Sequence, residues 1–496
     1  MEEIDTRVEP TIEMTLQDVK KKAVRGVAVL TSRTLVLNAI SFVAQGLLWA
    51  FIEPSEYGVF LLVSATINFL SYFADIGLGA ALIQKKEQPQ SKDYKTVFLV
   101  QEALVLTIVA IVFAISPYLA KTHSLSREAV ILLYALNISF FLASLKNIPS
   151  IMLERKLEFS KFIIPQVLET VIYNIFLVFF AWKGFGITSF TYAVLIRGVV
   201  GLVAIYIVQP WKPGIGFSKE SLKNLLKFGV PYQLNNFLAT VKDDGLTIVL
   251  GGILGNYGLG ILGTAQKLSQ YPLRFFMDNV TKVTFPAFSR MQDDKDDLIR
   301  SLNRSVFFVC ALVYPSLAGL IALFPELITV IPKYQKWAPV FVPLVFLSVN
   351  SAIAAFSTQL TNLLTSVGKI KTTLKLMVMW TSLSWLILPL LSRRWGISGA
   401  AVGYAIVGIS SFIILYITKK VLNWSIFNSI IKPFLAALVM GCILYVAKNL
   451  LPYNLSSFVF LVFVGVLVYA GFLYLLVGGS LIDDVKKTIA NIFSKK

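Results

Sequence analysis

Charged and amide side chains recur inside an otherwise apolar stretch of the sequence, between Phe228 and Pro286. A charged side chain at mid-depth in hydrocarbon costs roughly 2.5–3.5 kcal/mol on insertion scales, so such groups must face one another or face water. We therefore expect two helices that line a polar cavity within the membrane. The residues concerned are Gln233, Asn236, Lys242, Asp243 and Asp244, followed by Lys267, Arg274, Asp278 and Lys282.

Helical phase predicts which of these charges share a face. At about 100° per residue, the last four fall within about 80° of one another and form a stripe of three cations and one acid. The polar residues of the first group share a face about 100° wide, except that Lys242 points nearly opposite. Further polar stripes are predicted near residues 55–82 and 27–51, and Arg197 adds a cation to another apolar run.

Such a lining suits a ligand with an anionic phosphate and a sugar-like polar body. Arginine and lysine hold phosphate oxygens, and amide and hydroxyl groups meet sugar hydroxyls. The candidate substrate-binding residues are Arg33, Asn68, Asp75, Arg197, Gln233, Asn236, Asp243, Asp244, Lys267, Arg274, Asp278 and Lys282. The alternative is that these charges only pair with one another, as Asp278 and Lys282 would at i, i+4. Glu102 and Glu169 could take a coupling proton, but satisfied polar contacts are favoured for both.

The elements that must position these residues are membrane-spanning helices. The chain has 496 residues, 56% hydrophobic and 15% charged, which is too little charge to cover a soluble protein of this size. Its apolar runs are each long enough to cross roughly 30 Å of hydrocarbon. We predict an all-α polytopic membrane protein with about fourteen spans. Their expected limits are 27–51, 55–82, 96–120, 128–150, 162–182, 186–208, 228–254, 257–287, 302–331, 338–366, 371–392, 395–418, 430–450 and 455–478.

Lysine and arginine are distributed unevenly between the predicted loops. About 31 lie in the two tails and in alternate loops, against about 8 in the opposite loops. Because cytoplasmic loops carry the excess of positive charge, both termini are predicted to be cytoplasmic in a protein of the cytoplasmic membrane. The same bias accounts for the net charge of +18 without nucleic acid as a partner.

Two short motifs recur at matching positions, Tyr57-Gly58 with Tyr257-Gly258 and Gly186-Ile187 with Gly396-Ile397. They predict two parallel copies of a six-helix unit, with a site between the halves. The predicted parts are a cytoplasmic tail 1–26, a first lobe 27–208, a cytoplasmic linker 209–227, a second lobe 228–418, two further spans in 419–478 and a cytoplasmic tail 479–496. In the linker, Ser218 is the expected N-cap of a short amphipathic helix on the membrane surface.

The sequence carries no motif of enzyme chemistry. It has no glycine-rich phosphate loop with its lysine and no paired catalytic carboxylates with a histidine. Its cysteines, Cys310 and Cys442, lie in apolar runs without metal-ligand spacing. We therefore predict a protein that is not an enzyme and that has no cofactor and no metal site.

Two stretches carry motifs of a known family. The first is Pro54-Ser55-Glu56-Tyr57-Gly58 with the run 73–84 (FADIGLGAALIQ), and the second is Phe285-Pro286-Ala287-Phe288-Ser289-Arg290 with Gln292-Asp293-Asp294. They resemble Wzx-type polysaccharide flippases of the multidrug/oligosaccharidyl-lipid/polysaccharide exporter superfamily, in the teichuronic-acid and colanic-acid exporter branch. The resemblance implies a V-shaped transporter with two lobes and alternating access, which flips polyprenyl-(pyro)phosphate-linked oligosaccharide from the cytoplasmic to the outer leaflet of the lipid membrane.

That resemblance also bears on partners and on the site. It implies coupling to a proton or sodium gradient and polysaccharide polymerases as partners. With a lipid-linked phosphate as substrate, helical phase and depth would assign the phosphate to Arg33, Arg197, Lys267 and Arg274.

Two other functions stay open. A cation-coupled multidrug exporter of the same superfamily would need an acidic cavity, for which Asp75, Asp243 and Asp244 are the candidates. A non-transporting scaffold of a polysaccharide-assembly complex would keep polysaccharide export intact when the buried charges are neutralised.

Overall fold

The computed structural model describes residues 16–478, and the regular elements in this part of the chain are all helical. The first helices are α1 (Leu16–Phe51), α2 (Pro54–Ser71), α3 (Leu78–Gln84), α4 (Ser91–Thr122), α5 (Arg127–Ser144), α6 (Asn147–Arg155), α7 (Phe159–Trp182), α8 (Thr188–Val208) and α9 (Lys219–Thr240). They are followed by α10 (Leu246–Arg290), α11 (Lys295–Val330), α12 (Phe341–Ser366), α13 (Ile370–Ser410), α14 (Ile413–Val421), α15 (Lys432–Ala447) and α16 (Leu455–Val477). Short 3₁₀ or π-helical segments, η1 (Tyr72–Ala74), η2 (Val241–Gly245), η3 (Pro332–Val340), η4 (Phe427–Ile431) and η5 (Lys448–Leu450), lie between some of them. The predicted all-α class is confirmed.

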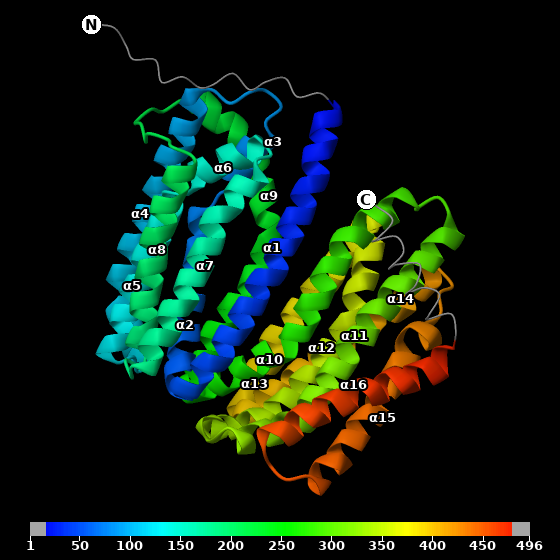
Figure 1. Ribbon diagram of the computed structural model, residues 1–496. Helices are drawn as coiled ribbons and strands as arrows, with labels where there is room; N and C mark the ends of the chain where they lie inside the picture. Colours follow the sequence, from blue (N-terminus) through cyan, green and yellow to red (C-terminus); the bar gives the residue numbers. More distant parts are fainter. Residues whose placement is uncertain (1–15, 479–496) are drawn as a thin grey trace, which may run out of the picture. The chain divides into compact units, whose positions relative to one another are not determined.

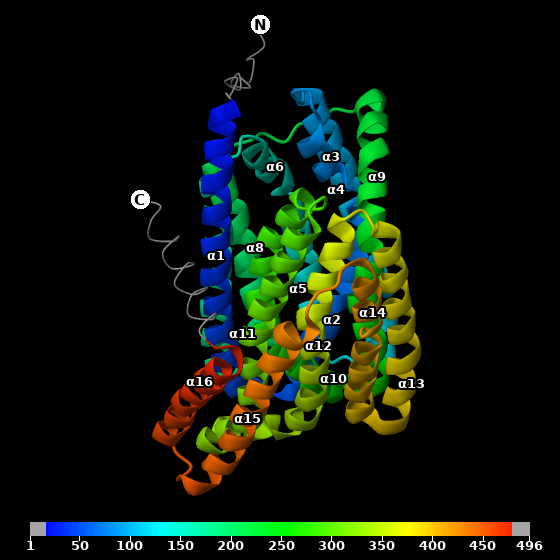
Figure 2. The ribbon, with the colours of Figure 1, turned by 90° about the vertical axis from the view of Figure 1, so that its right-hand side faces the viewer.

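The helices pack as two compact units, one ending at Leu259 and the other beginning at Gly260. In the first unit, α7 packs against α1 and α8, and α5 packs against α2, α4 and α8 (Figure 1). In the second unit, α11 packs against α12, α15 and α16, and α12 packs against α13 (Figure 2). Helix α9 contacts α3 and α4, so it groups with the first unit. This division falls later in the chain than the lobe boundary predicted at residue 228, which stays a prediction.

Eleven helices among the described residues are long and apolar enough to cross a membrane, so the chain is a multi-pass membrane protein. Two of them, Phe237–Arg290 and Ile370–Val421, are 54 and 52 residues long. As single rods they would extend about 80 Å, far beyond a hydrocarbon layer of about 30 Å. Both are broken, because Gly255 (φ 68°) and Gly396 (φ 57°) adopt backbone angles outside the helical range. If each counts twice and α1 is added, the helices allow fourteen crossings, and that total stays a prediction.

The end of the linker and the helix after it form one continuous element, α9. The Ser218 side chain accepts a hydrogen bond from the Ser221 amide (3.3 Å), which confirms the predicted N-cap. The helix is longer than predicted, because it continues to Thr240 and then through η2 into α10. The prediction places the apolar side of this helix on the membrane surface, whereas the structure packs that side against the protein. Leu225 is buried among side chains of α3, α4 and α6, because this face finds apolar partners within the protein.

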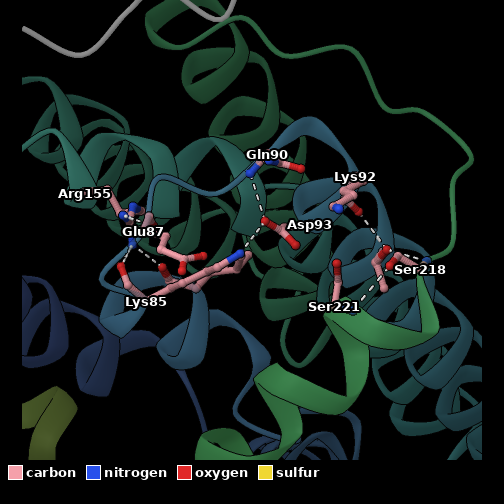
Figure 3. Close-up of polar contacts among 10 residues, drawn as sticks. Lys85, Glu87, Gln90, Lys92, Asp93, Arg155, Ser218 and Ser221 are labelled. Atoms are coloured by element: carbon pink, nitrogen blue, oxygen red, sulfur yellow. Dashed lines mark hydrogen bonds and ion pairs between the residues drawn. The ribbon is translucent and has the colours of Figure 1, made fainter.

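A polar network connects the start of α9 to the first turns of α4, and these to the loop between α3 and α4 (Figure 3). Asp93, in the first turn of α4, accepts hydrogen bonds from Lys85 Nζ (2.7 Å) and from the Gln90 amide (2.8 Å). The Ser218 amide donates to the Thr96 hydroxyl (2.9 Å). Both α4 and α9 therefore begin in a region where their free amide groups have partners.

The turn at residues 75–77 brings the backbone of the chain against α9. Asp75 Oδ1 accepts a hydrogen bond from the Gly77 amide (2.9 Å). Gly77 has φ 75°, and a Cβ atom there would overlap the backbone of Gly229. Only glycine allows both this backbone angle and this close approach. Asp75, a candidate binding residue, thus has a local structural partner.

Candidate anion-binding site

The first unit contains a cavity of about 350 Å³ with a lining rich in polar side chains. It lies among α1, α7, α8 and the junction of α5 with α6. Three cations and one acid line it, namely Arg33, Lys146, Arg197 and Glu169. Asn147, Ser150, Gln166 and Thr170 add amide and hydroxyl groups.

Glu169 projects from α7 toward α8. Gly201 of α8 lies so close that a Cβ atom there would overlap the Glu169 carboxyl group. The missing side chain therefore lets the two helices pack while leaving room for the carboxylate. Glu169 is only 8% exposed, and a carboxylate this buried needs charged or hydrogen-bonding partners.

Two cations partner this carboxylate at unequal distances. Lys146 Nζ lies 2.7 Å from Oε1, within the range of a charge-assisted hydrogen bond. Arg197 Nε lies 3.7 Å from Oε2, beyond hydrogen-bonding distance. The Arg197 guanidinium also lies 5.6 Å from the centre of the Tyr173 ring, a cation–π distance. The satisfied contacts predicted for Glu169 are therefore confirmed.

Arg33 brings the third cation from α1. Its Nε atom is buried and has no hydrogen-bond partner among the described residues, and the same is true of Gln166 Oε1. Buried polar atoms are nearly always paired with protein or water, so these two atoms in residues that line the cavity are exceptions. With three cations and one acid, the lining has a net charge of +2. A phosphate group carrying close to two negative charges would balance it.

The sequence prediction and the structure overlap here in part. Arg33 and Arg197 are predicted binding residues, and the structure brings them to one cavity. Sequence reasoning misses Lys146, which looks like one of many loop cations, and considers Glu169 only as a proton site or a polar contact. These two residues belong to different elements, so no helical phase relates them. Glu102, the other acid considered, accepts a hydrogen bond from the Ser144 hydroxyl (2.9 Å) outside this cavity.

A second group of candidates joins α2 to η2 within the first unit. The Asp244 side chain hydrogen-bonds with Asn68. Lys242 Nζ lies 3.6 Å from Asp243 Oδ1. These charges stand on the π-helical turn Val241–Gly245, and such turns are frequent at functional sites. The structure therefore gives three of the candidates polar partners near one π-helical turn.

Two more candidates stand on α9. Gln233 offers its backbone carbonyl, which accepts a hydrogen bond from the Tyr72 hydroxyl. The side chain of Asn236 lies outside the described residues. Gln233 does not line the cavity of the first unit.

The remaining candidates stand on α10 in the second unit. Arg274 and Lys282 are exposed, and Lys267 interacts electrostatically with Tyr271. Within residues 16–478, no ion pair joins Asp278 to Lys282. The stripe is thus not explained by that internal pair.

Neighbours of this stripe hold α10 against α12. The Thr281 hydroxyl accepts hydrogen bonds from the side-chain amides of Gln359 and Asn362, each at 3.1 Å. Gln359 is fully buried. Polar groups near the stripe therefore serve helix packing in the second unit.

The fold defines the class of protein, a multi-pass helical membrane protein. It is similar to the lipid II flippase MurJ in its inward closed conformation, with a TM-score of 0.74 over 90% of this chain and 98% of that chain, at 17% identity. It is also similar to an inward-facing multidrug resistance MATE family transporter of the MOP superfamily, with a TM-score of 0.57 over 78% and 95% of the two chains, at 17% identity.

Residues 47–341 match the family described as Polysaccharide biosynthesis protein, and the chain belongs to that family. The succinoglycan biosynthesis transport protein ExoT of Rhizobium meliloti is 23% identical over 284 residues. The matched region is 57% of this chain, and the chain spans only 57% of the length of that relative. The lipopolysaccharide biosynthesis protein WzxC of Escherichia coli K12 is 22% identical over 406 residues, 80% of each chain. The resemblance to Wzx-type proteins is thereby confirmed.

Proposed function

We propose that this protein moves a polyprenyl-(pyro)phosphate-linked oligosaccharide across the cytoplasmic membrane, as a step in the biosynthesis of cell-surface polysaccharide. The observation that carries the proposal is the cavity in which Arg33, Lys146 and Arg197 accompany a single acid, Glu169. The family of the chain and the names of its relatives, one of them a transport protein, support polysaccharide as the cargo.

Phosphate is the group that this lining suits. Arginine presents a planar fork of donors that matches two phosphate oxygens at once, and lysine adds a point charge. The volume of about 350 Å³ is that of a small-ligand pocket. The cavity would therefore hold the charged head group, while the rest of the glycan and the prenyl chain extend beyond it.

The other predicted residues would serve the same substrate. Asn68, Gln233 and Asn236 would meet sugar hydroxyls, and Lys267 and Arg274 would add cations. The transport cycle would use alternating access of two lobes, driven by a proton or sodium gradient. Both termini would be cytoplasmic, and polysaccharide polymerases would be the partners that receive the product.

The two alternative functions agree less well with the cavity. An exporter of cationic drugs would need an acidic lining, whereas this lining has a net charge of +2. A scaffold without transport would have no use for the Arg33 donor, which has no partner among the described residues.

Reconstituted transport tests the proposal. The full-length protein is placed in proteoliposomes with a fluorescent polyprenyl-diphosphate-linked oligosaccharide, and translocation is measured as protection from a membrane-impermeant quencher. We expect Arg197→Gln to lower the rate at least about tenfold, because a hydrogen bond to a charged group contributes about 1.5–3 kcal/mol. Arg290→Gln, at an exposed position at the end of α10, is the matched control and should transport at the wild-type rate.

Absence of translocation by the wild-type protein, under conditions in which a known flippase is active, would overturn the proposal. Wild-type rates in both Arg33→Gln and Arg197→Gln would remove the phosphate site from this cavity.

A further inference from the structure

The two ion pairs of Glu169 differ in how firmly they hold. The Lys146 and Glu169 side chains are 16% and 10% exposed and meet at 2.7 Å, so separating them would strand a buried charge. The Arg197 side chain is 50% exposed and meets Glu169 at 3.7 Å. A half-exposed pair without a hydrogen bond is weak, so Arg197 can leave at little cost.

Arg197 keeps its donors available for another partner. A guanidinium has five N–H donors, and within the described residues Arg197 has only the long ion pair and the face of Tyr173. Arg33 lines the same cavity with a buried Nε that lacks a partner among those residues. An anion entering the cavity would thus meet two guanidinium groups that can turn to it.

We infer that Glu169 is an internal counter-ion, which the phosphate of the substrate displaces from Arg197 but not from Lys146. This inference rests on the proposed function and concerns the release of substrate from the same site. In the empty site, Glu169 pairs with Lys146 and attracts Arg197. In the loaded site, Arg197 turns to the phosphate while Lys146 keeps the carboxylate in place.

This exchange gives Glu169 a defined effect on transport. The carboxylate repels the incoming phosphate and competes with it for Arg197, so it lowers the affinity of the site. When the phosphate leaves, Arg197 returns to Glu169, which eases dissociation. Because affinity within one site is set mostly by the dissociation rate, a site without this acid would bind the phosphate tightly and release it slowly.

A double-mutant cycle tests the competition directly. Binding of farnesyl diphosphate to the purified full-length protein in phosphatidylcholine nanodiscs is measured for the wild type, Glu169→Gln, Arg197→Gln and the double variant. We expect Glu169→Gln to bind about tenfold tighter and Arg197→Gln about tenfold weaker. In the Arg197→Gln background, Glu169→Gln should increase the affinity much less, because Arg197 is no longer present to be released from the carboxylate.

The matched control is Glu102→Gln, which removes another buried acid of the same unit and should leave the affinity unchanged. Inorganic pyrophosphate is the second probe, and the same ratio between variants is expected because Glu169 acts on the phosphate groups. The inference is overturned if Glu169→Gln binds no more tightly than the wild type, or if its full gain in affinity persists in the Arg197→Gln background. It is also overturned if the gain is seen with farnesyl diphosphate but not with inorganic pyrophosphate. If Glu169→Gln does not fold, Lys146→Met/Glu169→Gln replaces it and should bind tighter than Lys146→Met.

A measurement of transport distinguishes a failure of this inference from a failure of the proposed function. In the proteoliposome assay, Glu169→Gln should translocate more slowly than the wild type at saturating substrate, because release becomes slower. If the wild type translocates nothing while the binding cycle behaves as expected, flipping is wrong and the counter-ion role stands. If the wild type translocates and the binding cycle fails, only the counter-ion role is wrong.

Discussion

Two buried carboxylates of the first unit, Asp93 and Glu169, each lie 2.7 Å from a lysine, yet their surroundings differ. Asp93 is 1% exposed, and its donors are Lys85, the Gln90 amide and the Ser221 side chain of α9 (Figure 3). Glu169 shares its cavity with cations in excess, including an Arg33 donor that lacks a partner among the described residues. The balance of donors and acceptors, more than the presence of charge, separates a structural cluster from a candidate binding site.

Net charge supports the same distinction. A pocket of about 210 Å³ beside Asp93 is lined by two lysines and three acids, namely Lys85, Lys92, Glu87, Asp93 and Glu220. Its lining therefore has no excess of positive charge, whereas the cavity around Glu169 has a net charge of +2. Changes in the Asp93 region should thus affect stability, and changes around Glu169 should affect phosphate binding.

The largest effect on stability is expected from Gly77→Ala, at the turn that meets α9. The left-handed backbone costs an alanine about 1–2 kcal/mol, and its Cβ would overlap the Gly229 backbone, so we expect a loss of about 3 kcal/mol. Thermal unfolding in nanodiscs measures it, and farnesyl diphosphate binding below the transition should stay at the wild-type value. Gly471→Ala, in α16 with no atom within 4 Å of the added Cβ, is the control. Equal melting temperatures for Gly77→Ala and the wild type would contradict the close approach to α9.

Asp93→Asn should have a smaller effect of the same kind. The asparagine can still accept from the Gln90 amide but cannot neutralise Lys85, whose side chain is 28% exposed and can turn toward water. We therefore expect a loss of about 1–2 kcal/mol in unfolding free energy. Asp293→Asn, at an exposed position, should unfold like the wild type. If Asp93→Asn changes the free energy of farnesyl diphosphate binding more than it changes the free energy of unfolding, the distinction between the Asp93 region and the Glu169 cavity is wrong.

Local signals in the sequence predict much of this fold. Hydropathy identifies the membrane-spanning class, and the Ser218 cap follows from residues within one helical turn. The expected span limits place breaks near Gly255 and Gly396, where the structure has them. These features depend on neighbours in sequence, so a single chain is enough to reveal them.

The candidate anion-binding cavity is only partly predictable from the sequence, for a physical reason. Helical phase relates residues on one helix, as in the predicted stripe of α10, but it does not show which helices meet. The contact between Lys146 and Glu169 joins two elements, and its geometry depends on the packing of α7 against α8 at Gly201. The burial of Leu225 on α9 is not predicted for the same reason, because its partners lie on α3, α4 and α6.

Glu154 in α6 is a third carboxylate that can be compared with Asp93 and Glu169. Among the described residues, its carboxyl group has neither a hydrogen bond nor an ion pair. Burial raises the pKa of its carboxyl group above the usual 4.5, so the folded state holds this proton more tightly than the unfolded state. Stability therefore falls as the pH rises from the usual pKa through the raised one, and at pH 7.5 the ionised group destabilises the fold.

Glu154→Gln should melt higher than the wild type at pH 7.5, by less than about 1 kcal/mol of unfolding free energy. The gain should shrink as the pH falls through the usual pKa of 4.5, because the wild-type carboxyl group then becomes protonated in both states. A gain that stays constant with pH would mean that the substitution acts through packing and that burial of an unpaired charge is not the cause.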